Sequence, residues 1–284
     1  MAQSKKLETA IDFINQKDFM LYTNFYIKDK FFINLDGMPD KLISYKKQNN
    51  IFISDESEIT YKFNSDGFRS EEFKKINGKS ILTGGCSHTF GLGLSEDMSW
   101  PHLLNNNFFN YSLYNIGILG FTTPIIINNV FYFFKKYGIP EYMFLNLPSI
   151  NRKTYYDKDR KAICLTHDPY FFDDQDALIK FFNKNNNHLY DTFINTCILI
   201  KNLENISDIL NIKFKWFSWD EYTQELYQQI NFKHLIHKSN FYETTQDDKI
   251  KYRLFGKYET LAEDRWHPGT LQQFSWAKTF INSL

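Results

Sequence analysis

The chain has 284 residues, of which 33 are basic (Lys and Arg) and 33 are acidic (Asp and Glu), so its formal net charge is zero. This balance argues against a nucleic-acid scaffold, because displacing counterions from phosphates requires a basic surplus. Hydrophobic residues make up 43% of the chain, which excludes disorder over its whole length.

The first 77 residues differ in pattern from the remainder and predict a strand-containing N-terminal extension. A short helical pattern covers residues 7–14, and apolar runs typical of strands follow it, separated by polar turns. The expected strands are 31–35, 51–53 and 59–63. The Asp66-Gly67 pair in the connector 64–70 favours a tight turn.

From residue 78 to residue 284, strand patterns alternate with helical patterns. The expected strands are 80–85, 111–117, 142–147 and 212–217. The expected helices are 98–106, 122–137, 189–210, 221–230 and 269–284, and the polar tract 183–188 is expected to be a loop. This alternation is typical of a parallel sheet covered by helices on both faces. We therefore predict an α/β domain over 78–284 after an extension over 1–77.

Cysteine usage and the N-terminal sequence favour a cytoplasmic protein. Cys86, Cys164 and Cys197 include no CxxC pair, so their spacing indicates neither a disulfide framework nor a zinc site. The first twenty residues lack the apolar segment of a signal peptide, and the most apolar stretch, 124–134, is too short to span a bilayer. We expect no membrane association, no metal and no cofactor. A composition rich in Phe, Ile, Asn and Lys is typical of an AT-rich genome, which leaves a phage origin and a place in a virion open.

Two loops at the predicted carboxyl edge of the sheet carry residues that could do chemistry, because ligands of open parallel sheets bind at that edge. The first, GGCSHTFGLG over 84–93, presents Ser87 where a strand meets a helix. The second, NIGILGFTT over 115–123, closes a strand and opens a helix, so its N–H groups can point at an anion. Taken alone, the first loop is weak evidence, since a Gly-rich turn with a capping serine also explains it. For the second loop alone, a Gly-containing connector with a threonine cap is the favoured interpretation.

A third loop, EDRWHPG over 263–269, precedes the last predicted helix and places Asp264 and His267 three residues apart. One turn can put both side chains on one side, so that the carboxylate holds one imidazole nitrogen and leaves the other free as a base. The simpler interpretation is an aspartate cap beside a surface histidine. The three loops in this order are more specific than any one of them.

The order and spacing of these three loops resemble those of the motif blocks in the SGNH (GDSL-like) hydrolase superfamily, over residues 79–284. GCSHTFG (85–91) is similar to the first block of that family, NIGILG (115–120) to its Asn-x-Gly-x-x-Gly block, and DRWHP (264–268) to its Asp-x-x-His-Pro block. The resemblance implies a three-layer α/β/α, flavodoxin-like sheet.

The resemblance also implies an esterase or O-acylesterase that works by acyl transfer. Ser87 would be the nucleophile, His267 the general base and then acid, and Asp264 the residue that orients His267. The N–H groups of Ser87 and Gly120, with the Asn151 side chain, would form the oxyanion hole. The implied substrate is a small-molecule or carbohydrate ester, with carbohydrate deacetylation preferred.

Two departures from the family pattern favour other hypotheses. Cys86 stands where the family has an aspartate, and in the third block Ser149 replaces a glycine and Arg152 replaces an aspartate, although Asn151 is kept. An altered oxyanion block fits a binding or structural protein that retains the fold, such as a glycan-binding module or a virion component. An acyltransferase with the same triad would differ only in the acceptor of the acyl group.

Other reactive side chains rank lower. Cys86 could act as a thiol nucleophile beside His88, but a small residue packed in the turn is the favoured interpretation. No carboxylate or histidine at a fitting spacing supports a metal site at His88 and His102. His234 and His237 lie in a polar stretch, which favours a solvated face.

Overall fold

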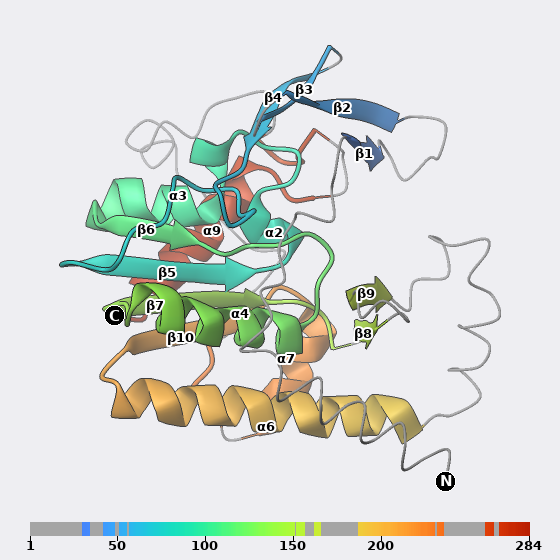
Figure 1. Ribbon diagram of the computed structural model, residues 1–284. Helices are drawn as coiled ribbons and strands as arrows, with labels where there is room; N and C mark the ends of the chain where they lie inside the picture. Colours follow the sequence, from blue (N-terminus) through green and yellow to red (C-terminus); the bar gives the residue numbers. More distant parts are fainter. Residues whose placement is uncertain are drawn as a thin grey trace, which may run out of the picture.

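The centre of the structure is a four-stranded parallel sheet with helices on both faces (Figure 1). The computed structural model describes residues 30–34, 42–48, 51–55, 57–150, 152–156, 162–165, 187–230, 232–235, 259–263 and 267–284. The central strands are β5 (Ser80–Gly85), β6 (Ser112–Asn115), β7 (Tyr142–Leu147) and β10 (Lys213–Ser218), in the spatial order β10-β7-β5-β6. Numbered along the chain this order is 2-1-3-4, which is flavodoxin-like, so the predicted α/β fold class is confirmed.

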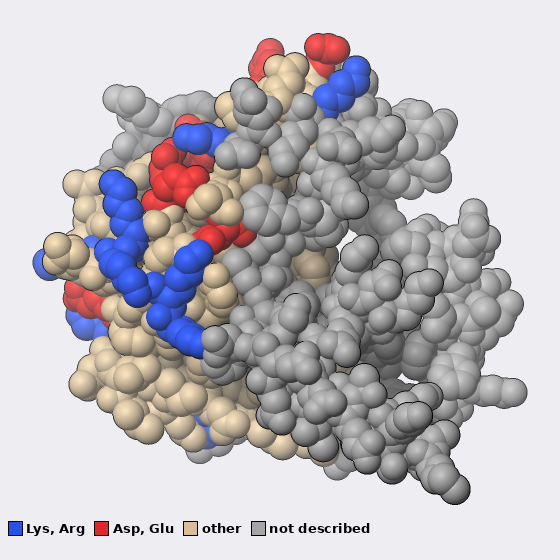
Figure 2. Space-filling model, viewed as in Figure 1, with Lys and Arg blue, Asp and Glu red and all other residues tan. Residues whose placement is uncertain are grey.

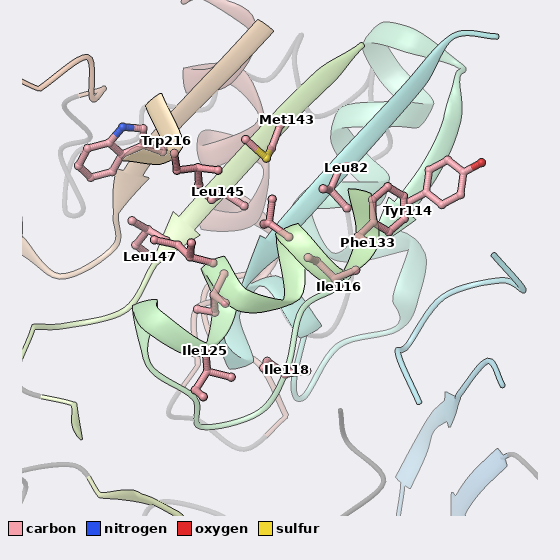
Figure 3. Close-up of a cluster of buried hydrophobic side chains, with 14 of the residues drawn as sticks. Leu82, Tyr114, Ile116, Ile118, Ile125, Phe133, Met143, Leu145, Leu147 and Trp216 are labelled. Carbon is pink, nitrogen blue, oxygen red and sulfur yellow. The ribbon is translucent and has the colours of Figure 1, made fainter. Parts of the chain in front are cut away.

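The sheet is the middle layer of three. α4 (Thr123–Tyr137) and α6 (Asn187–Ile209) pack on one face, whereas α3 (Trp100–Leu104) and α9 (Thr270–Ile281) pack on the other. A further helix, α7 (Glu221–Gln228), follows β10. Figure 3 shows the core between α4 and the sheet, where Leu82, Met143 and Leu145 point at the helix.

The central strands are apolar along their whole length because both of their faces are covered. All six residues of β5 are buried. Within it, Leu82 belongs to the core under α4, and its neighbour Ile81 belongs to the core under α9. This alternation places consecutive side chains of a strand in different cores.

A second, antiparallel sheet lies N-terminal to the central one and forms part of the predicted extension. Its strands are β1 (Lys30–Asn34), β2 (Leu42–Gln48), β3 (Ile51–Ser54) and β4 (Ser57–Lys62), in the spatial order β1-β2-β3-β4. Phe52, Tyr61 and Phe63 pack against Phe90, which belongs to the loop after β5. The extension therefore contacts the segment that carries Ser87. The boundary at residue 77 stays a prediction.

The expected helix over 98–106 is wrong in detail. A short 3-10 turn, η2 (Glu96–Met98), precedes α3, and a π-helical turn, η3 (Asn105–Phe109), follows it. Pro101 is the reason for the break, because it has no N–H and can only stand in the first turn of a helix.

Other differences concern the edges of the fold. The structure adds the strand β2 and the antiparallel pair β8 (Lys153–Tyr156) and β9 (Ala162–Leu165), none of which the apolar pattern predicts. β2 is hidden in the sequence because its second half is polar, with Lys46 and Gln48 exposed. α6 begins at Asn187, inside the expected loop 183–188, since polar side chains are tolerated in the first turn of a helix. The helix expected over 7–14 lies outside the described residues.

On the face shown in Figure 2, basic side chains lie beside acidic ones, as a net charge of zero implies. Ion pairs at the surface include Lys62 with Glu71, at 3.2 Å, and Lys213 with Glu141, at 3.1 Å. Among the described residues, no helix combines the length and the apolarity that crossing a membrane requires.

Candidate active site

Ser87 lies at the point where the strand order of the central sheet reverses, between β5 and β7. It is the first residue of α2 (Ser87–Phe90), directly after β5, and Cys86 is the N-cap. Gly85 makes the sharp strand-to-helix turn, with φ of +158°. A Cβ at Gly85 would collide with the Thr89 hydroxyl and lie 2.5 Å from the Asn146 carbonyl oxygen, so the close approach of α2 to β7 requires a glycine here.

The second loop is fastened to α2 by the Asn115 side chain at the end of β6. Its Oδ1 accepts a hydrogen bond from the Gly117 N–H at 3.0 Å, and its Nδ2 donates to the Thr89 carbonyl at 3.2 Å. The asparagine of the second block thus shapes the loop. Gly120 follows in the turn before α4, exposed and with φ of +74°. As the first residue of its helix, Ser87 has an N–H with no acceptor within that helix.

His267 reaches Ser87 from a segment 180 residues further along the chain. Its Nε2 lies 2.8 Å from Ser87 Oγ. The preceding segment is pinned by Glu263, whose N–H donates to the Gly93 carbonyl at 2.9 Å and whose Oε2 accepts from Ser57 Oγ at 2.8 Å. The Ala262 N–H donates to the His267 carbonyl at 2.9 Å. His267 is therefore held in position by contacts with β4, with the Ser87 loop and with the start of α9.

Aromatic rings pack around His88, which lies beside the imidazole of His267. His88 stacks on Trp219, with ring centroids 4.3 Å apart and an interplanar angle of 20°. The same His88 ring lies 5.1 Å from His267 and 5.5 Å from Trp276. Burial above all lowers the pKa of His88 well below its ordinary value, and the nearby charges of His267 and Arg152 lower it further. His88 is therefore a neutral part of the wall at neutral pH.

The structure describes some of the predicted site residues and not others. Ser87 and His267 are brought together, and Gly120 follows the strand β6 beside β5. Asp264 and Asn151 lie outside the described residues. Arg152, the neighbour of Asn151, follows β7, and its guanidinium carbon lies 5.4 Å from the Trp219 ring centroid.

Burial opposes the alternative of a cysteine nucleophile, although the Cys86 thiol does contact an imidazole. Cys86 is fully buried, and its Sγ lies 3.5 Å from His88 Nδ1. The side chain in contact with His267 is that of Ser87. Within the described ranges, no cluster of three or more His, Cys, Asp or Glu side chains could hold a metal ion.

Two further histidines, His102 and His234, make other contacts. His102 contacts Glu96, with His102 Nε2 3.3 Å from Glu96 Oε1. His234 packs on Trp216, with centroids 5.3 Å apart, rather than on the solvated face that the sequence favoured, and burial lowers its pKa. His237 lies outside the described residues.

Sequence reasoning missed Trp219 and Asn146. Trp219 comes directly after β10, so the rule that ligands bind at carboxyl ends of strands could have singled it out. Asn146, in register with Gly85, is fully buried, and neither its Oδ1 nor its Nδ2 has a hydrogen-bond partner. A polar side chain that the fold does not use therefore lies beside the Ser87 turn.

No protein-family model matches the chain, and no curated protein matches its sequence. Solved structures do resemble it. A protein described as a lipolytic protein of the G-D-S-L family, from Desulfitobacterium hafniense, is 11% identical with a TM-score of 0.41, over 73% of this chain and 100% of that one. A member of the same family from Veillonella parvula is 11% identical with a TM-score of 0.32, over 72% and 97%.

The psychrotrophic esterase EstA from Pseudoalteromonas is 16% identical with a TM-score of 0.36, over 72% of this chain and 96% of that one. The chain is thus similar in structure to lipolytic proteins of the G-D-S-L family and to an esterase. At these identities and TM-scores, neither an activity nor a residue role is transferred.

Proposed function

We propose that this protein is a serine hydrolase of the SGNH type that cleaves esters. The observation that carries the proposal is the 2.8 Å contact between Ser87 Oγ and His267 Nε2 at the strand-order reversal of the sheet. A serine hydroxyl is a weak nucleophile, and an imidazole within hydrogen-bond reach is the usual means of activating it.

In the proposed reaction, His267 Nε2 takes the proton of Ser87 Oγ while Oγ attacks the acyl carbon of the ester. The tetrahedral intermediate collapses, and the alcohol leaves with the proton that His267 held. Water then attacks the acyl-serine, giving up a proton to His267, and the acid departs as Ser87 regains its hydrogen. From the family resemblance, Asp264 would orient the imidazole.

The same resemblance supplies the proposed oxyanion donors, which are the N–H groups of Ser87 and Gly120 and the Asn151 side chain. Fixed donors of this kind stabilise the charge that develops on the carbonyl oxygen. Carbohydrate O-acyl groups stay the preferred substrate class within this proposal, and water the preferred acceptor. Product analysis in the presence of an added alcohol distinguishes a hydrolase from an acyltransferase.

The test is covalent labelling with a fluorophosphonate, which reacts only with an activated serine. We expect the purified protein to be labelled at Ser87, and the label to be lost in Ser87→Ala and in His267→Ala. Hydrolysis of 4-nitrophenyl acetate should fall in both variants, by a factor on the order of 10⁴.

Ser218→Ala is the matched control, because Ser218 is a buried serine at the carboxyl end of β10 whose Oγ donates to the Leu147 carbonyl at 3.1 Å. This variant should keep the label. A folded wild-type protein that takes up no label, or takes it up at another residue, would contradict the proposal and favour a binding or structural protein.

A further inference from the structure

Arg152 has an unused N–H donor although it is partly buried. Its Nη1 is out of contact with solvent, yet it has no hydrogen-bond partner. Its guanidinium lies over the Trp219 ring, 5.4 Å from the centroid, and its backbone N–H closes a turn to the Ser149 carbonyl at 3.2 Å. A buried guanidinium N–H without an acceptor is unfavourable, so this donor calls for an explanation.

Trp219 has a second unused donor at the same place. Its indole Nε1 is likewise buried and has no partner. Its backbone is fixed, because the Trp219 N–H donates to the Leu147 carbonyl at 3.3 Å. The two side chains come from the segments that follow β7 and β10, neighbouring strands of the sheet.

The acidic residue next to Trp219 is already engaged. Asp220 caps α7, and its Oδ2 accepts from the Thr223 N–H at 2.9 Å and from the Thr223 hydroxyl at 2.5 Å. This carboxylate oxygen is therefore engaged in the helix cap. Among the described residues, no carboxylate forms an ion pair with Arg152.

Contacts between rings link these donors to the proposed catalytic pair. Arg152 lies on Trp219, Trp219 stacks on His88 at 4.3 Å, and His88 lies 5.1 Å from His267. The charge of Arg152 is also close enough to His88 to lower its pKa. Arg152 and the Ser87–His267 pair are thus connected through the Trp219 and His88 rings.

We propose that Arg152 and Trp219 form a subsite for an oxyanion, a carboxylate or a phosphate, carried by the ester that Ser87 attacks. A guanidinium is the side chain best matched to such groups, because it donates parallel hydrogen bonds to two oxygens. The inference rests on the proposed function for its substrate, and it narrows that substrate from esters in general to anionic esters. The anion is a part of the substrate that does not react, and it orients the acyl carbon toward Ser87.

The first experiment measures binding without turnover. Succinate and inorganic phosphate are titrated separately, by calorimetry, into full-length Ser87→Ala protein, so that the two arms distinguish a carboxylate from a phosphate ligand. We expect one of them to bind, and binding to weaken about tenfold to a hundredfold in the additional variant Arg152→Gln, because a charge-assisted hydrogen bond is lost. Trp219→Phe keeps the ring but removes the N–H, and it should weaken binding by a smaller factor.

Lys213→Gln is the matched control. It removes one positive charge at the amino end of β10, where Lys213 pairs with Glu141, and it should leave anion binding unchanged. The proposal would be overturned if neither succinate nor phosphate binds. It would also be overturned if Lys213→Gln weakens anion binding as much as Arg152→Gln does.

The second experiment measures selectivity. The ratio of kcat/KM for the 4-nitrophenyl monoester of succinic acid to that for 4-nitrophenyl acetate should fall about tenfold or more in Arg152→Gln, mainly through KM. Arg152→Lys should recover part of the ratio, because it restores the charge without the planar fork. An equal fall for both esters would overturn the subsite, since Arg152 would then act on the reacting carbonyl.

The two proposals can fail separately. Labelling of Ser87 without any anion selectivity would leave the hydrolase standing and remove the subsite. Anion binding that depends on Arg152 in a protein without a labelled serine would leave the subsite standing and remove the hydrolase.

Discussion

Two arginines lie near the Ser87 loop, and the fold treats them in opposite ways. Arg69 is 1% exposed, and its Nη1 and Nη2 donate to the carbonyls of Thr60, Phe90, Gly91 and Leu94 at distances between 2.7 and 3.3 Å. Arg152 is only partly buried, and its Nη1 donates to nothing. Both terminal nitrogens of Arg69 therefore have backbone acceptors, although its Nε has none, whereas Nη1 of Arg152 has no acceptor.

The comparison shows that two arginines of equal charge differ in the acceptors that the fold provides for their terminal nitrogens. Both guanidinium groups lie over aromatic rings, Arg69 at 4.4 Å from the Tyr61 centroid and Arg152 at 5.4 Å from that of Trp219. Both also depress the pKa of a histidine, His102 in the first case and His88 in the second. Their burial and the hydrogen bonds of their terminal nitrogens distinguish them.

The largest expected effect is on stability, in Arg69→Met. This substitution keeps much of the packing but leaves the carbonyls that Arg69 joins, from β4 and the loop after α2, without donors. We expect the free energy of unfolding to fall by about 3–5 kcal/mol. Urea denaturation checks this value. A loss below about 1 kcal/mol would mean that Arg69 does not hold the Ser87 loop to the extension.

The sequence predicts the strands around this site better than the contacts between its side chains. β5 and β7 are predicted almost to the residue because buried parallel strands are continuously apolar. Ser87 and His267 are candidates because of their loops, and the family resemblance is what assigns them to one site. The 2.8 Å contact between them joins segments 180 residues apart, and no local pattern encodes such a distance.

The roles of the two arginines lie further beyond local sequence. Arg69 is one charged residue in a turn-rich connector, and its acceptors are backbone carbonyls, whose positions the side-chain pattern does not reveal. The position of Arg152 can be read from its block, where it replaces an aspartate. Whether its Nη1 has an acceptor depends on how Trp219, which follows another strand, packs against it.

The second prediction concerns acid stability and the histidine near Arg69. Burial, and then the charge of Arg69, lowers the pKa of His102 to about 4. Between pH 6.5 and about 4 the unfolded chain therefore binds more protons at this residue than the folded one, so stability rises with pH, by about 1.4 kcal/mol per pH unit. His102→Gln should flatten the acid limb of a plot of unfolding free energy against pH.

Glu96, the partner of His102, acts in the opposite sense, because burial raises the pKa of its carboxyl. Its protonation favours the folded state as the pH falls, so the observed slope is smaller than that of His102 alone. Glu96→Gln should consequently steepen the acid limb. Identical limbs in wild type and His102→Gln would show that the pKa of His102 is the same in the folded and the unfolded chain, against the burial argument.

A smaller effect is expected for the tyrosine under Arg69. The Gly93 N–H donates to the Tyr61 hydroxyl at 2.9 Å, and Tyr61 is fully buried. Tyr61→Phe leaves that N–H unpaired and should lower stability by about 1–2 kcal/mol. Tyr227→Phe is the matched control, since the buried Tyr227 hydroxyl has no partner and its removal should be neutral or stabilising. Equal losses in both variants would contradict the assignment.

The smallest effect on stability is expected at Arg152, and it decides whether the two arginines differ in their contribution to the fold. Arg152→Met is the same substitution as at Arg69, but it removes a buried N–H that no group of the chain accepts. The change in unfolding free energy should stay within about 0.5 kcal/mol, because the desolvation penalty of the donor disappears with it. Urea denaturation of the two Met variants, measured side by side, gives the difference directly. A loss at Arg152 as large as at Arg69 would assign both guanidinium groups to the fold. A loss confined to Arg69 leaves the charge of Arg152 with no structural task, and a donor that the fold does not need is one that a substrate can use without weakening the protein.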